Sequence, residues 1–129
     1  MKITEHSFSS ERHTSFYLSC GPEDGLPIIM LHGWPDLSIG WEKQLKFFGA
    51  QGYHAIAPDM RGYGSSSIPE NQSDYCMKEI VVDMMELLSS LGHKEAIWVG
   101  HDWGSPVVWN IALHHPEVVK GLVLSLIHI

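Results

Sequence analysis

Residues 96–105 read Ala-Ile-Trp-Val-Gly-His-Asp-Trp-Gly-Ser, and this stretch decides which fold we expect. Its first four residues form a short apolar run that is typical of a buried strand. The residues after it are mostly apolar and predict a helix, with Pro106 in the first turn, where the missing N–H costs no helical bond. Gly100 and Gly104 flank Asp102 between these two elements. The stretch therefore predicts a sharp strand-to-helix turn with Asp102 at its centre.

The rest of the chain alternates strand and helix patterns around this turn. Short apolar runs predict buried strands at 27–31, 53–58, 96–99 and 118–124. Apolar residues at helical spacing predict helices at 40–51, 74–91 and 103–114. Residues 3–8 and 12–19 resemble an amphipathic hairpin. Such alternation predicts an α/β fold with a mostly parallel sheet and helices on both faces.

The helix expected at 74–91 has the clearest two-sided pattern. Ser73 or Asp74 is a suitable cap for its start, and Gly92 follows its end. Its polar face is expected to carry Lys78, Glu79, Asp83 and Glu86.

Composition narrows the function classes. The 129 residues are 44% hydrophobic and 18% charged, as in globular domains, so we expect one domain or part of one. The net charge of −7 argues against nucleic acid or an anionic membrane as a partner. Without a signal peptide pattern or a disulfide framework, a cytoplasmic protein is expected. No histidine has metal-ligand spacing, so neither a metal nor a cofactor is expected.

Asp102 has two alternative interpretations. A turn that lifts one carboxylate to a helix N-terminus favours a nucleophile with a stabilised negative charge. Aspartate is also a favoured residue for simply capping a helix. The segment His32-Gly33-Trp34-Pro35-Asp36 follows the first buried strand. If its loop crosses beside the turn, the backbone N–H groups of Trp34 and Trp103 would form an oxyanion hole. A plain proline turn is the alternative there.

A third segment, Asp-Met-Arg-Gly-Tyr-Gly-Ser-Ser at 59–66, is rich in glycine and serine. We expect a structural role for it, in which Asp59 and Arg61 tie the loop together by charge-assisted bonds. In order and spacing, the three segments together resemble the epoxide hydrolase branch of the α/β-hydrolase superfamily. The resemblance extends roughly from Phe16 to Val123.

The resemblance implies the chemistry. An aspartate is ionised near neutral pH, so Asp102 would attack a saturated carbon without help from a base and form an alkyl-enzyme ester. A histidine oriented by a second acid would then activate water against that ester, and two lid tyrosines would protonate the opening ring. The expected substrate is a small apolar epoxide. A haloalkane dehalogenase is the nearest alternative, but such enzymes often have Asn or Glu where this chain has Trp34. A non-catalytic member of the fold is a further alternative, and the oligomeric state is left open.

The resemblance also implies that the catalytic histidine, its acid and the lid tyrosines are absent from this chain. We expect 1–123 to be the N-terminal portion of the core domain. A DNA stretch CTG-TCT-CTT-ATA-CAC-ATC would encode residues 124–129, and it resembles a transposon-end adaptor used in sequencing libraries. We therefore expect these six residues to be a non-native tail, with a natural apolar strand end as the alternative.

Overall fold

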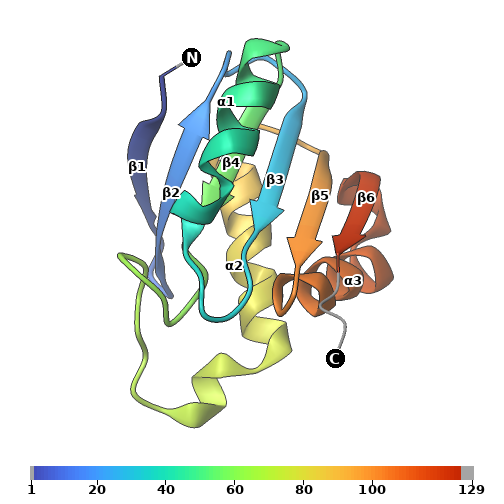
Figure 1. The fold of residues 1–129 in the computed structure, drawn as a ribbon. Helices are drawn as coiled ribbons and strands as arrows, with labels where there is room; N and C mark the ends of the chain where they lie inside the picture. Colours follow the sequence, from blue (N-terminus) through green and yellow to red (C-terminus); the bar gives the residue numbers. More distant parts are fainter. Residues whose placement is uncertain (1, 126–129) are drawn as a thin grey trace.

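The computed structural model describes residues 2–125, which form one sheet with helices on both faces (Figure 1). Three short 3₁₀ turns, η1 to η3, lie between the longer elements. The order is β1 (Thr4–Ser9), β2 (Thr14–Cys20), β3 (Pro27–Leu31), η1 (Ser38–Trp41), α1 (Glu42–Ala50), β4 (His54–Pro58), η2 (Gln72–Tyr75), α2 (Met77–Ser90), β5 (Ala96–His101), α3 (Gly104–His114), η3 (Pro116–Val118) and β6 (Val119–Ser125).

The sheet has the strand order β1-β2-β4-β3-β5-β6. The strands β4, β3, β5 and β6 run parallel to one another, and β2 and β1 extend the sheet as an antiparallel hairpin. The carboxyl ends of β3 and β5 therefore point to the same edge, as their arrows do in Figure 1. In open α/β sheets, ligand sites gather at that edge.

Each face of the sheet packs against its own helices. Leu45 of α1 is fully buried against one face, in a cluster that includes Ile28 and Met30 of β3. The opposite face packs against α2 and α3, where Ile29 and Trp98 are completely buried. Figure 1 shows α1 on one side of the strands and α2 and α3 on the other. Alternate residues of β3 thus face two different cores, which explains why its sequence is apolar throughout.

The predicted elements are confirmed, and two details of the predicted helix at 74–91 are wrong. Residues Gln72–Tyr75 form the turn η2, and α2 begins at Met77 with Cys76 as a cap that makes no side-chain hydrogen bond. Neither Ser73 nor Asp74 caps the helix. Asp83, expected on the polar face, is buried with 1% of its surface exposed. Its burial has a local cause, because arginines from two other segments meet its carboxylate.

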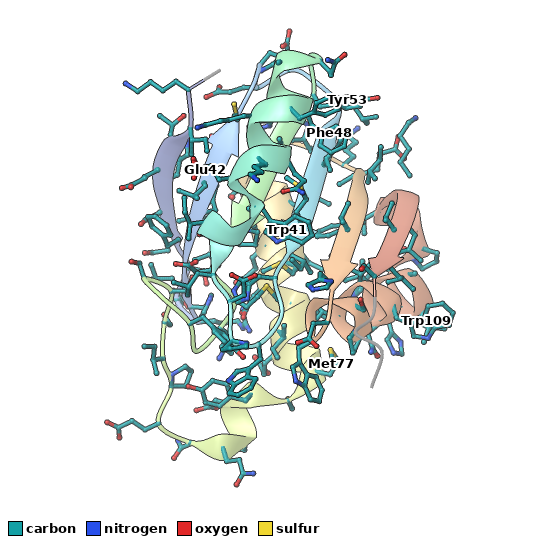
Figure 2. The ribbon with its side chains drawn as sticks, viewed as in Figure 1. Trp41, Glu42, Phe48, Tyr53, Met77 and Trp109 are labelled. Carbon is teal, nitrogen blue, oxygen red and sulfur yellow. The ribbon has the colours of Figure 1, made fainter. Side chains whose placement is uncertain are left out.

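Apolar side chains are exposed on β6, which is an edge strand of the sheet, and on α3. Leu122, Val123 and Leu124 of β6 are exposed, as are Trp109 and Leu113 of α3. Figure 2 shows Trp109 on the outer side of α3, away from the sheet. Part of the predicted non-native tail, residues 124 and 125, belongs to β6, and 126–129 lie outside the described residues. Among the described residues, no helix has the length and apolar character needed to cross a membrane.

Candidate active site

The turn between β5 and α3 holds Asp102 in a conformation that few residues adopt. Its φ is +55°, and no other non-glycine residue within 2–125 has a positive φ. Left-handed backbone at such a residue costs about 1–3 kcal/mol and persists only where the surroundings impose it. Here the N–H of Asp102 donates to the carbonyl of Ser125 in β6 at 2.9 Å, and its carbonyl accepts from Ser105 N–H at 3.0 Å. The strained turn is therefore fixed on both sides.

The two glycines of the turn are required by close backbone contacts. A Cβ on Gly100 would lie 2.5 Å from the carbonyl oxygen of Gly104. A Cβ on Gly104 would lie 2.3 Å from the carbonyl oxygen of Leu31 at the end of β3. Both distances are too short for any side chain, so the start of α3 packs directly on the strand beside it. This is the sharp strand-to-helix turn that the sequence predicts.

The loop after β3 passes directly beside Asp102. A Cβ on Gly33 would lie 2.3 Å from the Cβ of Asp102, so only glycine allows this approach. The backbone N–H of Trp34 donates to Asp102 Oδ2 at 2.9 Å. The backbone N–H of Trp103, the next residue along the chain, also lowers the pKa of this carboxyl. The structure thus brings the three predicted site residues, Asp102, Trp34 and Trp103, into one cluster.

The two amides act on the charge of Asp102. Together they hold the pKa of its carboxyl below the ordinary value of 3.8, with Trp34 as the larger cause. Hydrogen bonds to the ionised form favour that form, so the group is a carboxylate at neutral pH. Trp34 and Trp103 are 62% and 66% exposed, so the two residues whose amides act on the carboxylate also present apolar surface to the solvent. The arrangement suits a charged nucleophile facing an apolar reactant.

His32 joins this loop to the segment at 59–66. Its ring is buried, with Nδ1 2.8 Å from the carbonyl oxygen of Gly33 and Nε2 3.0 Å from the backbone nitrogen of Met60. Its ring also packs edge-on against Tyr63 at 4.8 Å. Burial lowers the pKa of His32 below 6.5 and keeps the ring neutral. The sequence pattern predicts no role for His32, although this residue directly precedes Gly33 and Trp34.

Tyr63 is a second residue near the site that no sequence pattern predicts. Burial is the main cause that raises its pKa, and the negative charge of Asp102 adds to it, so the phenol lies within electrostatic reach of the carboxylate. Tyr63 and Trp103, the neighbour of Asp102 in the chain, line a pocket of about 240 Å³, together with His32, Met60, Arg61, Tyr75, Met77, Ile80 and Val107. Figure 2 shows Met77 at the start of α2, near the ends of the strands. The only sequence signal for Tyr63 was its place inside the third segment.

The structural role of that third segment is confirmed for Asp59 and wrong in detail for Arg61. Asp59 accepts from the backbone N–H of Ser38 at 2.9 Å and of Ser65 at 3.0 Å, so it closes its own loop and anchors η1. The side chain of Arg61 extends away from the loop, and its guanidinium donates to the carboxylate of Asp83 in α2. The segment therefore connects to both faces of the sheet.

The described residues contain no group of three or more His, Cys, Asp or Glu side chains arranged to hold a metal ion. Both nitrogens of His32 are occupied, and Nδ1 of His101 lies 3.2 Å from Ser125 Oγ. The two cysteines, Cys20 and Cys76, are free.

The sequence of this chain is similar to a family model and to several known proteins. Residues 27–128 match the family model described as the alpha/beta hydrolase fold. Epoxide hydrolase A of Mycobacterium tuberculosis is 45% identical over 101 residues, which are 78% of this chain and 31% of that protein. Epoxide hydrolase 2 of Siraitia grosvenorii is 42% identical over 129 residues, which are 99% of this chain and 40% of that protein.

Solved structures of epoxide hydrolases are also similar to this chain. The crystal structure of epoxide hydrolase A from Mycobacterium thermoresistibile superimposes with a TM-score of 0.92 at 35% identity, covering 95% of this chain and 39% of that one. An epoxide hydrolase from Vigna radiata gives a TM-score of 0.91 at 34% identity, covering 95% of this chain and 39% of that one. The chain thus spans about a third to two fifths of the length of these proteins.

Proposed function

Since the chain belongs to the alpha/beta hydrolase fold family, we propose that it supplies the nucleophile and the oxyanion hole of an enzyme that hydrolyses epoxides. The observation that carries this proposal is the carboxylate of Asp102, which is presented on a strained turn and accepts a hydrogen bond from the Trp34 N–H. The backbone N–H groups of Trp34 and Trp103 both lower its pKa. The names of the relatives support an epoxide as the reactant.

The first step uses the ionised carboxylate. One oxygen of Asp102 attacks an epoxide carbon, the ring C–O bond breaks, and an ester joins the aspartate to the substrate. The ring oxygen stays on the neighbouring carbon and becomes a hydroxyl when it takes a proton from an acid. The depressed pKa of Asp102 provides the anion at neutral pH without a base.

The second step uses the amides. Water attacks the ester carbonyl carbon of Asp102, and a negative charge develops on the carbonyl oxygen. Preorganised N–H donors stabilise such a charge, and removing one typically costs about 10²–10³ in rate. The N–H of Trp34 already lies 2.9 Å from Oδ2. Collapse of the intermediate releases a vicinal diol and restores the carboxylate.

The acid of the first step and the base of the second are proposed to come from outside residues 1–129. His32 has no free nitrogen to activate water. The complete protein, meaning this chain together with the residues that complete the fold, is therefore the unit expected to turn over.

The pocket beside Trp103 supports an apolar reactant. Its lining combines aromatic and sulfur-containing side chains, among them Tyr63, Tyr75 and Met77. Such side chains bind hydrocarbon groups by burial and contact with rings. We therefore propose a small apolar epoxide as the substrate.

Incubating the complete protein with styrene oxide tests the proposal. We expect the vicinal diol as product, and we expect Asp102→Asn to abolish its formation. Asp24→Asn is the matched control, since Asp24 is exposed in the loop before β3, at the opposite edge of the sheet. Diol formation that survives Asp102→Asn would contradict the proposal, as would halide release from a bromoalkane in the absence of epoxide turnover.

A further inference from the structure

We propose that His32 is a positioning residue of the oxyanion hole, because its imidazole holds the peptide unit between Gly33 and Trp34 in the orientation that directs the Trp34 N–H at Asp102. The inference rests on the proposed roles of Asp102 and Trp34.

The argument begins with the geometry of one peptide unit. The carbonyl of Gly33 and the N–H of Trp34 belong to the same planar group and point in opposite directions. At one end, the carbonyl accepts from Nδ1 of His32 at 2.8 Å. At the other end, the N–H donates to Asp102 Oδ2 at 2.9 Å. Rotation of this plane would therefore break both bonds at once.

The partners of His32 also fix which nitrogen carries the proton. The Gly33 carbonyl can only accept, so Nδ1 must carry a hydrogen. The backbone N–H of Met60 can only donate, so Nε2 must be bare. The ring is therefore the neutral Nδ1–H form. Its two hydrogen bonds connect the backbone of Met60 to the loop that carries Gly33 and Trp34.

The ring itself has little freedom to move. His32 is buried, and Tyr63 packs edge-on against it. Asp36 N–H donates to the same Gly33 carbonyl at 3.1 Å, so the carbonyl has two donors and His32 provides the shorter bond. Loss of His32 should weaken the orientation of the peptide without removing every restraint.

Two substitutions separate positioning from simple attachment of the two segments. His32→Asn places an amide N–H where Nδ1 lies and keeps a donor for Gly33, but it is too short to reach Met60. His32→Gln places an amide oxygen where Nε2 lies and keeps an acceptor for Met60, but it offers no donor at the Nδ1 position. If His32 positions the peptide, the Asn variant should hydrolyse the ester faster. If His32 only attaches the two segments, the Gln variant should be the faster one.

The test uses the complete protein, styrene oxide and rapid quenching, with formation and hydrolysis of the Asp102 ester followed separately by mass spectrometry. We expect His32→Gln to slow ester hydrolysis about tenfold, since full loss of an oxyanion donor costs about 10²–10³. We expect His32→Asn to hydrolyse the ester faster than His32→Gln does. Ester hydrolysis by the Gln variant that equals or exceeds that of the Asn variant would overturn the inference.

A second measurement holds even if both variants fail to fold. Nitrogen-15 NMR of the unsubstituted protein should show His32 as the neutral Nδ1–H tautomer, and a ring protonated on Nε2 would overturn the inference. The proposed function fails separately, because it requires an ester on Asp102 of the unsubstituted protein whatever His32 does.

Discussion

Arg61 and Asp83 form a two-pronged ion pair inside the protein, with Nε and Nη2 of the guanidinium 2.8 and 2.7 Å from the two carboxylate oxygens. Arg61 lies in the loop after β4, and Asp83 lies in the middle of α2. Both residues are buried. The pair therefore fixes the loop next to the site against the helix that covers the sheet.

A second arginine shares the same carboxylate. Arg12, in the turn between β1 and β2, lies 3.1 Å from Asp83 Oδ1 and also pairs with Glu79 and Glu86. Three segments distant in the sequence thus meet at one acid on α2. Two guanidinium groups compensate the charge of Asp83, which explains why a carboxylate is tolerated in the interior.

The first prediction concerns Asp83→Asn. Removing one partner of a buried ion pair leaves an uncompensated charge, so we expect the free energy of unfolding of the complete protein to fall by about 3–5 kcal/mol. Urea titration measures it. Glu42→Gln is the control, because Glu42 pairs with Lys46 at the exposed surface and its loss should cost about 0.5 kcal/mol at most. Equal effects of the two changes would contradict this account of the interior.

The second prediction concerns Gly33→Ala. The added methyl group would lie 2.5 Å from Asp102 Oδ2, so either the loop or the carboxylate must move. We expect diol formation to fall by about 10²-fold or more, as for loss of an oxyanion donor. Gly121→Ala in β6 is the control, since its nearest atom would be 3.5 Å away, an ordinary contact. Unchanged kcat and KM in Gly33→Ala would count against the close approach.

The third prediction concerns pH. Burial lowers the pKa values of His13, His32 and His54 below 6.5, so the unfolded chain binds more protons than the folded one once the pH falls through that value. The free energy of unfolding should therefore decrease as the pH falls from 7.5 to 5.5, by up to about 1.4 kcal/mol per pH unit for each proton. Urea titrations across this range measure the slope. A stability that is constant or rises toward pH 5.5 would contradict burial of these rings.

The fourth prediction concerns the isolated 129-residue chain. Val123 and Leu113 are exposed on β6 and α3, where apolar side chains find no cover among the described residues. We expect this chain to associate in sedimentation experiments, and we expect Val123→Lys with Leu113→Lys to reduce the association. With styrene oxide it should form at most one covalent adduct. A monodisperse, cooperatively unfolding monomer, or repeated turnover, would contradict this prediction.

The sequence predicted the order of strands and helices because each has a clean apolar pattern. The resemblance to the epoxide hydrolase branch predicted the cluster of Asp102, Trp34 and Trp103. Parallel strands bring their carboxyl ends to one edge, and glycines mark where the backbone turns sharply. These features depend on local sequence and on general rules of chain topology.

The burial of Asp83 could not be predicted in this way. A polar residue at a polar position of an amphipathic helix predicts exposure, and only the approach of Arg12 and Arg61 from other segments reverses that prediction. The position of His32 depends in the same way on the distant Met60 amide. Contacts between segments far apart in sequence leave no periodic pattern, so they appear only in the folded structure.

Isotope transfer tests the central claim most directly. In a single turnover of styrene oxide by the complete protein in H₂¹⁸O, the proposed mechanism has water attack the ester carbonyl of Asp102 rather than the substrate. The account therefore predicts ¹⁸O in the carboxylate of the Asp102 peptide and none in the diol. Label in the diol with an unlabelled Asp102 would show that water attacks the epoxide itself, and it would contradict the claim that Asp102 is the nucleophile.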